Sequence, residues 1–207
     1  IRDSSSSRWL GDVYKRQAYM ATFGVIASGI LGLLVGTLCA QNKFSSKFVL
    51  SVCDIFQTFP SFVYLIPVMM LFGVTDTSVL IAVIIYATIP ATRYTVEGLR
   101  SVPSALHDAG SMSGVTRIQR LLKIEFPLAF PHIMLGLNQT VVFALFMVII
   151  GAFIGTEDLG QYIMKALSDL KGGGKGLILG LCVAFIGLAV DNLCLLYTSD
   201  AADDVIS

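Results

Sequence analysis

The chain has 207 residues, of which 55% are hydrophobic and 14% are charged, and its mean hydropathy is +0.79. Soluble domains carry about a quarter charged residues, so this composition excludes an ordinary soluble domain and predicts a protein with membrane lipid as its solvent. The formal net charge is zero at pH 7, which gives no electrostatic footprint for a nucleic-acid partner.

The two ends of the chain differ abruptly in composition from the segments beside them. Residues 1–17 and 197–207 resemble translated adaptor sequence, and we expect both flanks to be non-native. Residues 18–196 are then predicted to form one transmembrane domain, because no linker between them suggests a second one. We also expect the native protein to extend further on its N-terminal side.

Five segments approach the length of about twenty mostly apolar residues that crosses a bilayer. They are Tyr19–Ala40, Phe48–Phe72, Ser78–Tyr94, Ile133–Ile154 and Leu177–Leu196. The predicted fold class is therefore all-α, a polytopic membrane protein with a core of five transmembrane helices.

The first segment carries small residues at intervals of four, which places them on one helical face: Gly24, Ser28, Gly32 and Gly36. Small residues let a second backbone approach closely in lipid, where no hydrophobic drive brings helices together. We favour packing inside one bundle over a dimerisation face for this stripe.

Lysine and arginine gather in cytoplasmic loops of membrane proteins. Lys43 and Lys47 follow the first segment, and further basic residues surround the polar loop of about residues 100–131: Arg93, Arg100, Arg117, Arg120 and Lys123. Two predicted helices separate these loops, so they share a side. The loop of residues 100–131 is therefore predicted to be cytoplasmic.

This polar loop is predicted to contain two short helices. Ser104 can begin the first, which runs to about Met112, and Gly114 suits a left-handed exit from it. Thr116 and Gln119 fit a capping box that begins the second helix.

We expect Pro127 to end the second helix. In the first helix, Ala105, Ala109 and Gly110 leave one face nearly bare of side chains, which suits insertion into a groove on a partner.

The loop resembles the coupling loop of permease subunits of binding-protein-dependent ABC importers, where Glu-Ala-Ala is followed by a glycine and then by Ile-x-Leu-Pro. The matching positions here are Asp108, Ala109, Gly110, Gly114, Ile124, Phe126 and Pro127. Spacing matches throughout, with aspartate for glutamate, glycine for alanine and phenylalanine for leucine. The resemblance covers about Tyr19–Leu193, and the runs Gln57–Gly73, Gly98–Pro103 and Pro127–Thr140 look most like the glycine betaine/proline branch.

The resemblance implies a multi-pass permease subunit of the bacterial inner membrane that transports a compatible solute such as glycine betaine, proline or choline. Its implied partners are a cytoplasmic ABC ATPase, an extracytoplasmic solute-binding protein and a second permease copy, with a homodimer expected. The implied ATPase-docking residues are Asp108, Ala109, Gly110, Gly114, Ile124 and Pro127.

The chain itself is expected to be a non-catalytic subunit that binds no cofactor. ATP and magnesium would belong to the partner ATPase, because the run KGGGKG at Lys171–Gly176 misses the GxxxxGK[ST] pattern. His107 and His132 and the four cysteines lack metal-ligand spacing, so no metal site is predicted.

Polar residues inside the predicted spans suggest a translocation pathway: Gln57, Ser61, Tyr64, Asn138 and Gln139. Pro60 and Pro67 would free backbone carbonyls there, which lipid tolerates only against protein or water. Kinks that serve packing alone remain an alternative. For Asp54 we favour structural pairing over contact with cargo, and Arg93 is a possible partner.

Two alternatives for the function stay open. An ABC permease for an amino acid or a sulfonate would keep the loop argument and change only the cargo. An ion-coupled secondary transporter is less well supported, because no inverted repeats with matching helix interruptions are visible.

Overall fold

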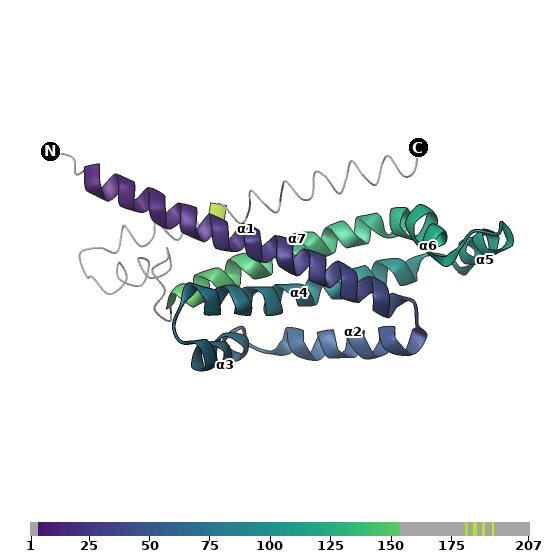
Figure 1. Ribbon diagram of the computed structural model, residues 1–207, viewed down its shortest axis with the longest axis horizontal. Coiled ribbons are helices and arrows are strands. Elements are labelled where there is room, and N and C mark those ends of the chain that lie inside the picture. Colours follow the sequence, from purple (N-terminus) through teal and green to yellow (C-terminus); the bar gives the residue numbers. More distant parts are fainter. Residues whose placement is uncertain (1–3, 154–180, 182–183, 186–187, 189–191, 193–207) are drawn as a thin grey trace. The chain divides into compact units, whose positions relative to one another are not determined.

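The computed structural model describes residues 4–153 and, beyond them, Leu181, Ala184, Phe185, Leu188 and Asn192. Its elements, in chain order, are α1 (Ser4–Ala40), α2 (Lys43–Thr58), α3 (Phe62–Phe72), α4 (Asp76–Ser101), α5 (Ser104–Met112), α6 (Arg117–Arg120), the π-helix η1 (Leu121–Glu125) and α7 (Phe126–Phe153) (Figure 1). No strand occurs among these residues, and the all-α prediction is confirmed.

Within the described part of the chain, three helical segments are long and apolar enough to cross a membrane: Ala18–Ala40, Asp76–Ser101 and Arg117–Gly151. The pair α2 and α3 adds a fourth if it is one broken span. The predicted count of five is not confirmed, because Leu177–Leu196 lies almost wholly outside the described residues. Large apolar side chains on α1 are exposed, including Leu34 at 57% and Leu38 at 70%, as lipid contact requires.

The predicted segment Phe48–Phe72 is not one straight helix, because the chain bends by 87° between Thr58 and Phe62. Proline has no backbone N–H and disfavours helical geometry in the residue before it. The helix α2 therefore ends at Thr58, two residues before Pro60. The chain then turns into α3, with the Val63 N–H donating to the Pro60 carbonyl at 2.9 Å.

The described residues form two compact units. The first comprises those within 1–28, 59–87 and 141–190, and the second those within 29–58, 88–140 and 191–207. The helices α1, α4 and α7 each contribute a part to both units.

In the first unit, α4 packs closely on α1 and α7 through glycines. A Cβ at Gly24 would lie 2.6 Å from Cγ1 of Val83, and a Cβ at Gly151 would lie 2.6 Å from Cγ1 of Val79. Ser28 is buried, and its hydroxyl donates to the Gly24 carbonyl at 2.6 Å. Such distances leave no room for a side chain, so these residues permit the close approach.

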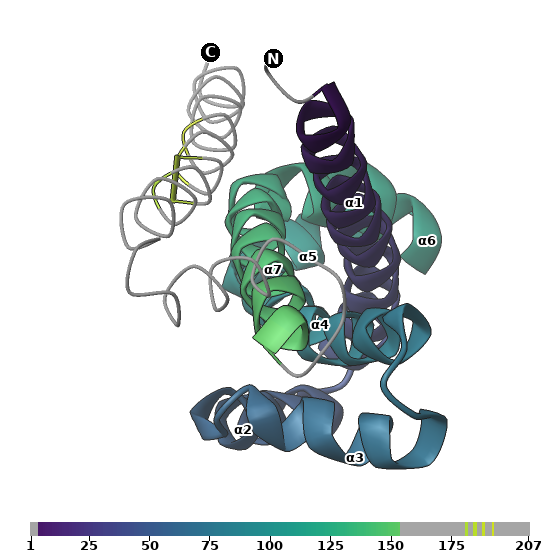
Figure 2. The ribbon, with the colours of Figure 1, turned by 90° about the vertical axis from the view of Figure 1, so that its left-hand side faces the viewer.

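The second unit repeats this arrangement further along the same helices. A Cβ at Gly36 of α1 would lie 2.6 Å from Cβ of Thr95 on α4, and a Cβ at Gly136 of α7 would lie 2.6 Å from Cβ of Tyr94. Figure 2 shows α1, α4 and α7 as neighbouring helices. The small-residue stripe predicted from the sequence therefore packs inside the bundle, as we favoured.

A buried cluster of Leu99, Ala129 and Ile133 joins the end of α4 to the beginning of α7 in the second unit. At the same level, a Cβ at Gly98 would lie 2.8 Å from Cβ of His132. Because α4 precedes the polar loop and α7 follows it, this cluster fixes both ends of the loop.

Candidate functional site

The polar loop folds as a hairpin of α5 and α6, which we call the loop hairpin (Ser104–Arg120). The helix α5 has the predicted bounds, and Gly114 adopts the predicted left-handed conformation with φ of +73°. The capping box is also confirmed. The Gln119 N–H donates to the Thr116 hydroxyl at 3.3 Å, and the Thr116 N–H donates to the Gln119 side-chain oxygen at 2.9 Å. Local hydrogen bonds therefore define where the second helix begins.

The second helix does not end at Pro127, and this prediction is wrong. It widens into η1 and passes directly into α7, with the Phe126 N–H donating to the Leu121 carbonyl. Pro127 is the second residue of α7, a position in the first turn where a missing N–H is tolerated. The Arg120 guanidinium bonds the Glu125 carboxylate at 2.8 Å, and these residues are separated by the five positions of a π turn.

Gly110 faces the inside of the loop hairpin, which corrects the expectation that it belongs to a bare outer face. It is buried, and a Cβ there would lie 3.1 Å from Cδ1 of Ile124 and 3.4 Å from Cγ of Arg120. The small residue thus lets α5 pack on the following turn. Ala105 and Ala109 remain exposed, so these two form the exposed part of the predicted bare face.

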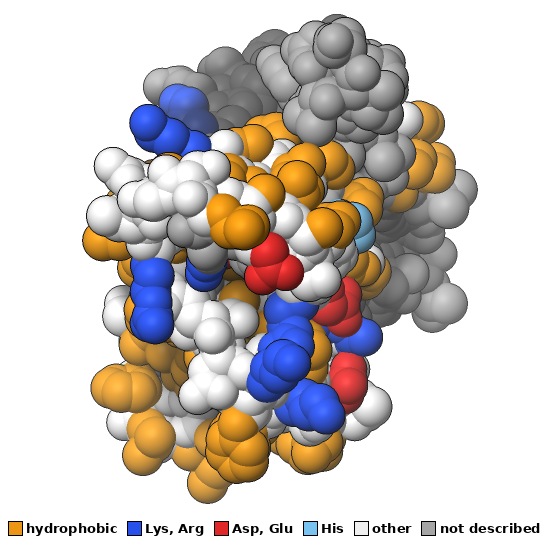
Figure 3. Space-filling view, turned by 90° about the vertical axis from the view of Figure 1, so that its right-hand side faces the viewer, with side chains coloured by type: hydrophobic (Ala, Val, Ile, Leu, Met, Phe, Trp, Pro, Cys, Tyr) orange, Lys and Arg blue, Asp and Glu red, His pale blue; other side chains and the backbone are white. Residues whose placement is uncertain are grey.

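The six predicted docking residues divide by exposure. Asp108, Ala109, Gly114 and Pro127 are exposed, Ile124 is half-buried and Gly110 is buried. Apolar side chains of the loop are also exposed, Met112 at 89% and Ile118 at 70%. Figure 3 shows this end of the second unit, with Lys, Arg, Asp and Glu side chains interspersed with hydrophobic ones. Contact with an ATPase stays a prediction for these residues.

Arg93 of α4 forms a charge network with α2 inside the second unit. Its guanidinium bonds the Asp54 carboxylate at 2.8 Å, the Gln57 side-chain oxygen at 2.7 Å and the Glu97 carboxylate at 3.0 Å. The favoured structural pairing of Asp54 is confirmed. Gln57, predicted for the pathway, is also held by this arginine.

We expect Arg93→Gln to destabilise the protein more than Asp54→Asn, because the first change leaves two carboxylates without their cation and the second removes only one ion pair. Partly exposed pairs are worth about 0.2–1 kcal/mol each. Thermal denaturation of the purified full-length protein measures the difference. The double variant Arg93→Gln/Asp54→Asn should be less destabilised than the sum of the two single variants, and strict additivity would contradict the network.

The other predicted pathway residues lie in both units. Ser61 and Tyr64 belong to the first, where the buried Tyr64 ring lies 5.1 Å from the ring of Tyr86. Asn138 is half-buried and Gln139 is exposed, both on α7 in the second unit. Their role in a pathway stays a prediction.

No group of three potential metal ligands occurs among the residues that the structure describes. Cys39 and Cys53 are free thiols. Cys182, Cys194 and the glycine-rich run at 171–176 lie outside the described residues.

Residues 30–197 match the model of a protein family described as the binding-protein-dependent transport system inner membrane component. The chain belongs to this family. The resemblance that rests on the loop residues is thereby confirmed. The chain is an inner membrane component of the ABC permease family, whose subunits are generally non-catalytic.

Two curated relatives bear on the branch of the family. The chain is 81% identical over 175 residues to the trimethylamine N-oxide transport system permease protein of Pelagibacter ubique, and 35% identical over 164 residues to the glycine betaine/proline betaine transport system permease protein of Salmonella typhimurium. The matches cover 84% and 79% of this chain. It spans only 24% and 46% of the length of these two relatives.

Solved ABC transporters share the fold. A chain of the MetNI methionine ABC transporter in an inward-facing conformation matches with a TM-score of 0.78 at 17% identity, covering 96% of this chain and 99% of that one. A chain of an amino acid ABC transporter crystallised with histidines gives 0.69 at 17% identity, covering 97% and 99%. At these identities the likeness confirms the permease fold alone.

Proposed function

We propose that this permease moves trimethylamine N-oxide across the inner membrane. The 81% identity to a permease named for that solute is the observation that carries the proposal. Glycine betaine is the second candidate, supported by the relatives at 34% and 35% identity whose names include it. The two solutes share a nitrogen with three methyl groups. The proposed cargo is therefore still a compatible solute of the expected chemical class, with trimethylamine N-oxide in place of glycine betaine as the first candidate.

The loop hairpin is the proposed docking site for a cytoplasmic ABC ATPase, which would bind the ATP and magnesium. Hydrogen bonds between Thr116 and Gln119 fix the beginning of the second helix of the loop hairpin. The cluster around Leu99 and Ala129 attaches both of its ends to the bundle. A force applied at the exposed Ala109 would therefore move α4 and α7 with it, as a rigid-body switch requires.

The remaining partners follow from the same proposal. An extracytoplasmic solute-binding protein would deliver the cargo. A second permease copy would provide the two-fold symmetry that a pair of ATPases needs, and a homodimer is the simplest arrangement.

Reconstitution tests this function directly. The full-length permease, its ATPase and its binding protein are placed in liposomes, and uptake of labelled trimethylamine N-oxide, glycine betaine and proline is compared. We expect uptake that depends on ATP and at least about tenfold preference for trimethylamine N-oxide, a difference of about 1.4 kcal/mol. Preference for glycine betaine or for the amino acid proline would overturn the proposed cargo. Uptake that persists with an inactive ATPase would overturn the class and favour an ion-coupled transporter.

A further inference from the structure

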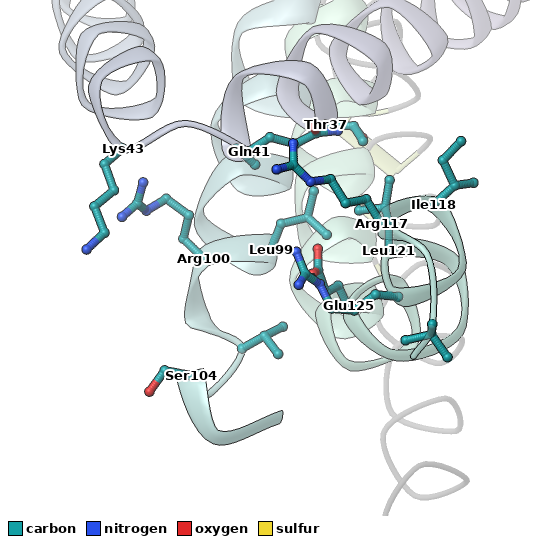
Figure 4. Close-up of a pocket in the computed structure, with 14 residues that line it drawn as sticks. Thr37, Gln41, Lys43, Leu99, Arg100, Ser104, Arg117, Ile118, Leu121 and Glu125 are labelled. Carbon is teal, nitrogen blue, oxygen red and sulfur yellow. The ribbon is translucent and has the colours of Figure 1, made fainter. Parts of the chain in front are cut away.

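A cavity of about 1040 Å³ lies within the second unit, behind the loop hairpin (Figure 4). Its walls come from the end of α1, the beginning of α2, the end of α4 and the segment α6–η1. Basic residues line it from three of these elements: Lys43, Arg100, Arg117 and Arg120. Among the described residues that line it, only Glu125 is acidic.

The cavity therefore holds a surplus of positive charge. Glu125 is already bonded to Arg120 at 2.8 Å, and Arg100 donates to the hydroxyl of Ser46, which carries no charge. Figure 4 shows the Arg117 side chain reaching toward Gln41 and Thr37. Basic side chains that gather in one concave site raise the local concentration of anions there, even where each side chain is exposed.

Of the other lining residues, three are polar and uncharged, Thr37, Gln41 and Ser104, and six are apolar: Ala40, Leu99, Val102, Val115, Ile118 and Leu121. A small hydrated anion such as inorganic phosphate would fill little of the volume and would leave this apolar wall without a partner. An amphiphile with an anionic headgroup satisfies both parts of the lining.

The location of the cavity points to the membrane as the source of this amphiphile. Ala40 and Ser101 are the last residues of two helices that are long enough to span a bilayer, and both helices end at the cavity wall. The end of a span lies at the level of the lipid headgroups. Basic residues at that level attract anionic lipids of the cytoplasmic leaflet, the side on which this loop is predicted to lie.

We propose that this cavity binds the phosphate headgroup of an anionic phospholipid from the cytoplasmic leaflet. Lys43 and Arg100 contact the headgroup from the helix ends, and Arg117 contacts it from the loop hairpin. The bound lipid links the loop hairpin to α2 and α4 and offsets the repulsion between their cations.

The test uses the full-length permease in detergent, with dioctanoyl phosphatidylglycerol as the probe and thermal stabilisation as the binding measurement. The variant Lys43→Gln/Arg117→Gln removes two cations from the cavity. The control Lys47→Gln/Lys123→Gln removes two exposed cations that do not line it. All four residues are exposed, so neither pair is expected to impair folding. At about 1 kcal/mol for each basic residue, the cavity variant should bind at least about tenfold more weakly. The control should change by about twofold or less.

Further ligands identify the source of the anion. Dioctanoyl phosphatidylcholine, inorganic phosphate and ATP should bind more weakly than the probe and should not depend on Lys43 and Arg117. Equal losses in the two charge-matched variants would overturn the proposal, as would phosphate or ATP binding as tightly as the probe. Displacement of the probe when the ATPase is added would also overturn it and would assign the cavity to an acidic segment of that partner. The experiment needs no transport, so its result is independent of the cargo.

Discussion

Replacing Gly32 by alanine should destabilise the protein by about 1–3 kcal/mol, the usual cost of adding atoms to a well-packed interior. A Cβ at this position would contact Ala91 of α4 and would lie 2.9 Å from the backbone nitrogen of Thr92. A backbone atom cannot rotate aside as a side chain can, so α4 would have to move away from α1. Gly32→Val adds two more methyl groups at the same contact and should prevent accumulation of folded protein.

Gly29 provides a matched control on the same helix. A Cβ there would meet only Cδ2 of Leu137, at 3.1 Å, the flexible end of a side chain. Gly29→Ala and Gly32→Ala change helix propensity equally, so their difference reports the contact with α4. Thermal denaturation of the two purified variants measures it. Equal midpoints would show that α1 and α4 do not approach as closely at Gly32 as the structure indicates.

Gly114→Asp should reduce transport at least about tenfold while ATP hydrolysis by the assembled transporter continues. Among the described residues, nothing lies within 4 Å of a Cβ at Gly114, so the substitution creates no steric overlap with them at this atom. Its charge would instead lie at the proposed docking surface beside Ala109. A tenfold loss corresponds to about 1.4 kcal/mol of weakened coupling, which one buried, unpaired carboxylate readily exceeds.

The control for this variant is Gly73→Asp. Gly73 also has a positive φ, +79°, and open space around its Cβ position. Gly73 combines this φ with a ψ of 175°, a conformation essentially restricted to glycine, so aspartate should be strained at least as much there as at Gly114. Gly73 follows α3 and lies outside the loop hairpin, so its variant should retain transport. Equal losses would attribute the effect to backbone strain, and normal uptake by Gly114→Asp would refute the docking site.

The features predicted correctly from the sequence depend on contacts between near neighbours. The capping box needs only Thr116 and Gln119, three residues apart, and the left-handed exit needs only the missing side chain of Gly114. The close packing of the small-residue stripe on α1 was predictable because regularly spaced small residues in a membrane helix are typical of close contact with another helix.

The incorrect predictions concern residues whose role depends on tertiary contacts. The inward direction of Gly110 is decided by Ile124 and Arg120, which the fold brings beneath α5. The helix continues through Pro127 by way of η1. No residue pattern in LLKIE predicts a π turn. Pro60 does end a helix, whereas Pro127 does not, and the two prolines look alike in sequence.

The candidate site was only partly predictable for the same reason. The side of the membrane on which the basic residues lie could be predicted from the charges of the loops. Their arrangement around one cavity could not, because Lys43 and Arg117 are far apart in sequence and meet only through the packing of α1, α4 and α6.

The widened turn η1 inserts the equivalent of one additional residue between the loop hairpin and α7. Each residue of an α-helix advances the side-chain direction by about 100°. Because a π turn closes over five residues where an α turn closes over four, η1 accommodates this residue without a rotation between the hairpin and α7. With a regular α turn over the same residues, the hairpin would instead be rotated about the α7 axis by roughly that angle, while Gly136 stayed against Tyr94. The direction of Asp108 and Ala109 relative to α7 therefore depends on the widened turn of a five-residue segment that is not adjacent to them in sequence.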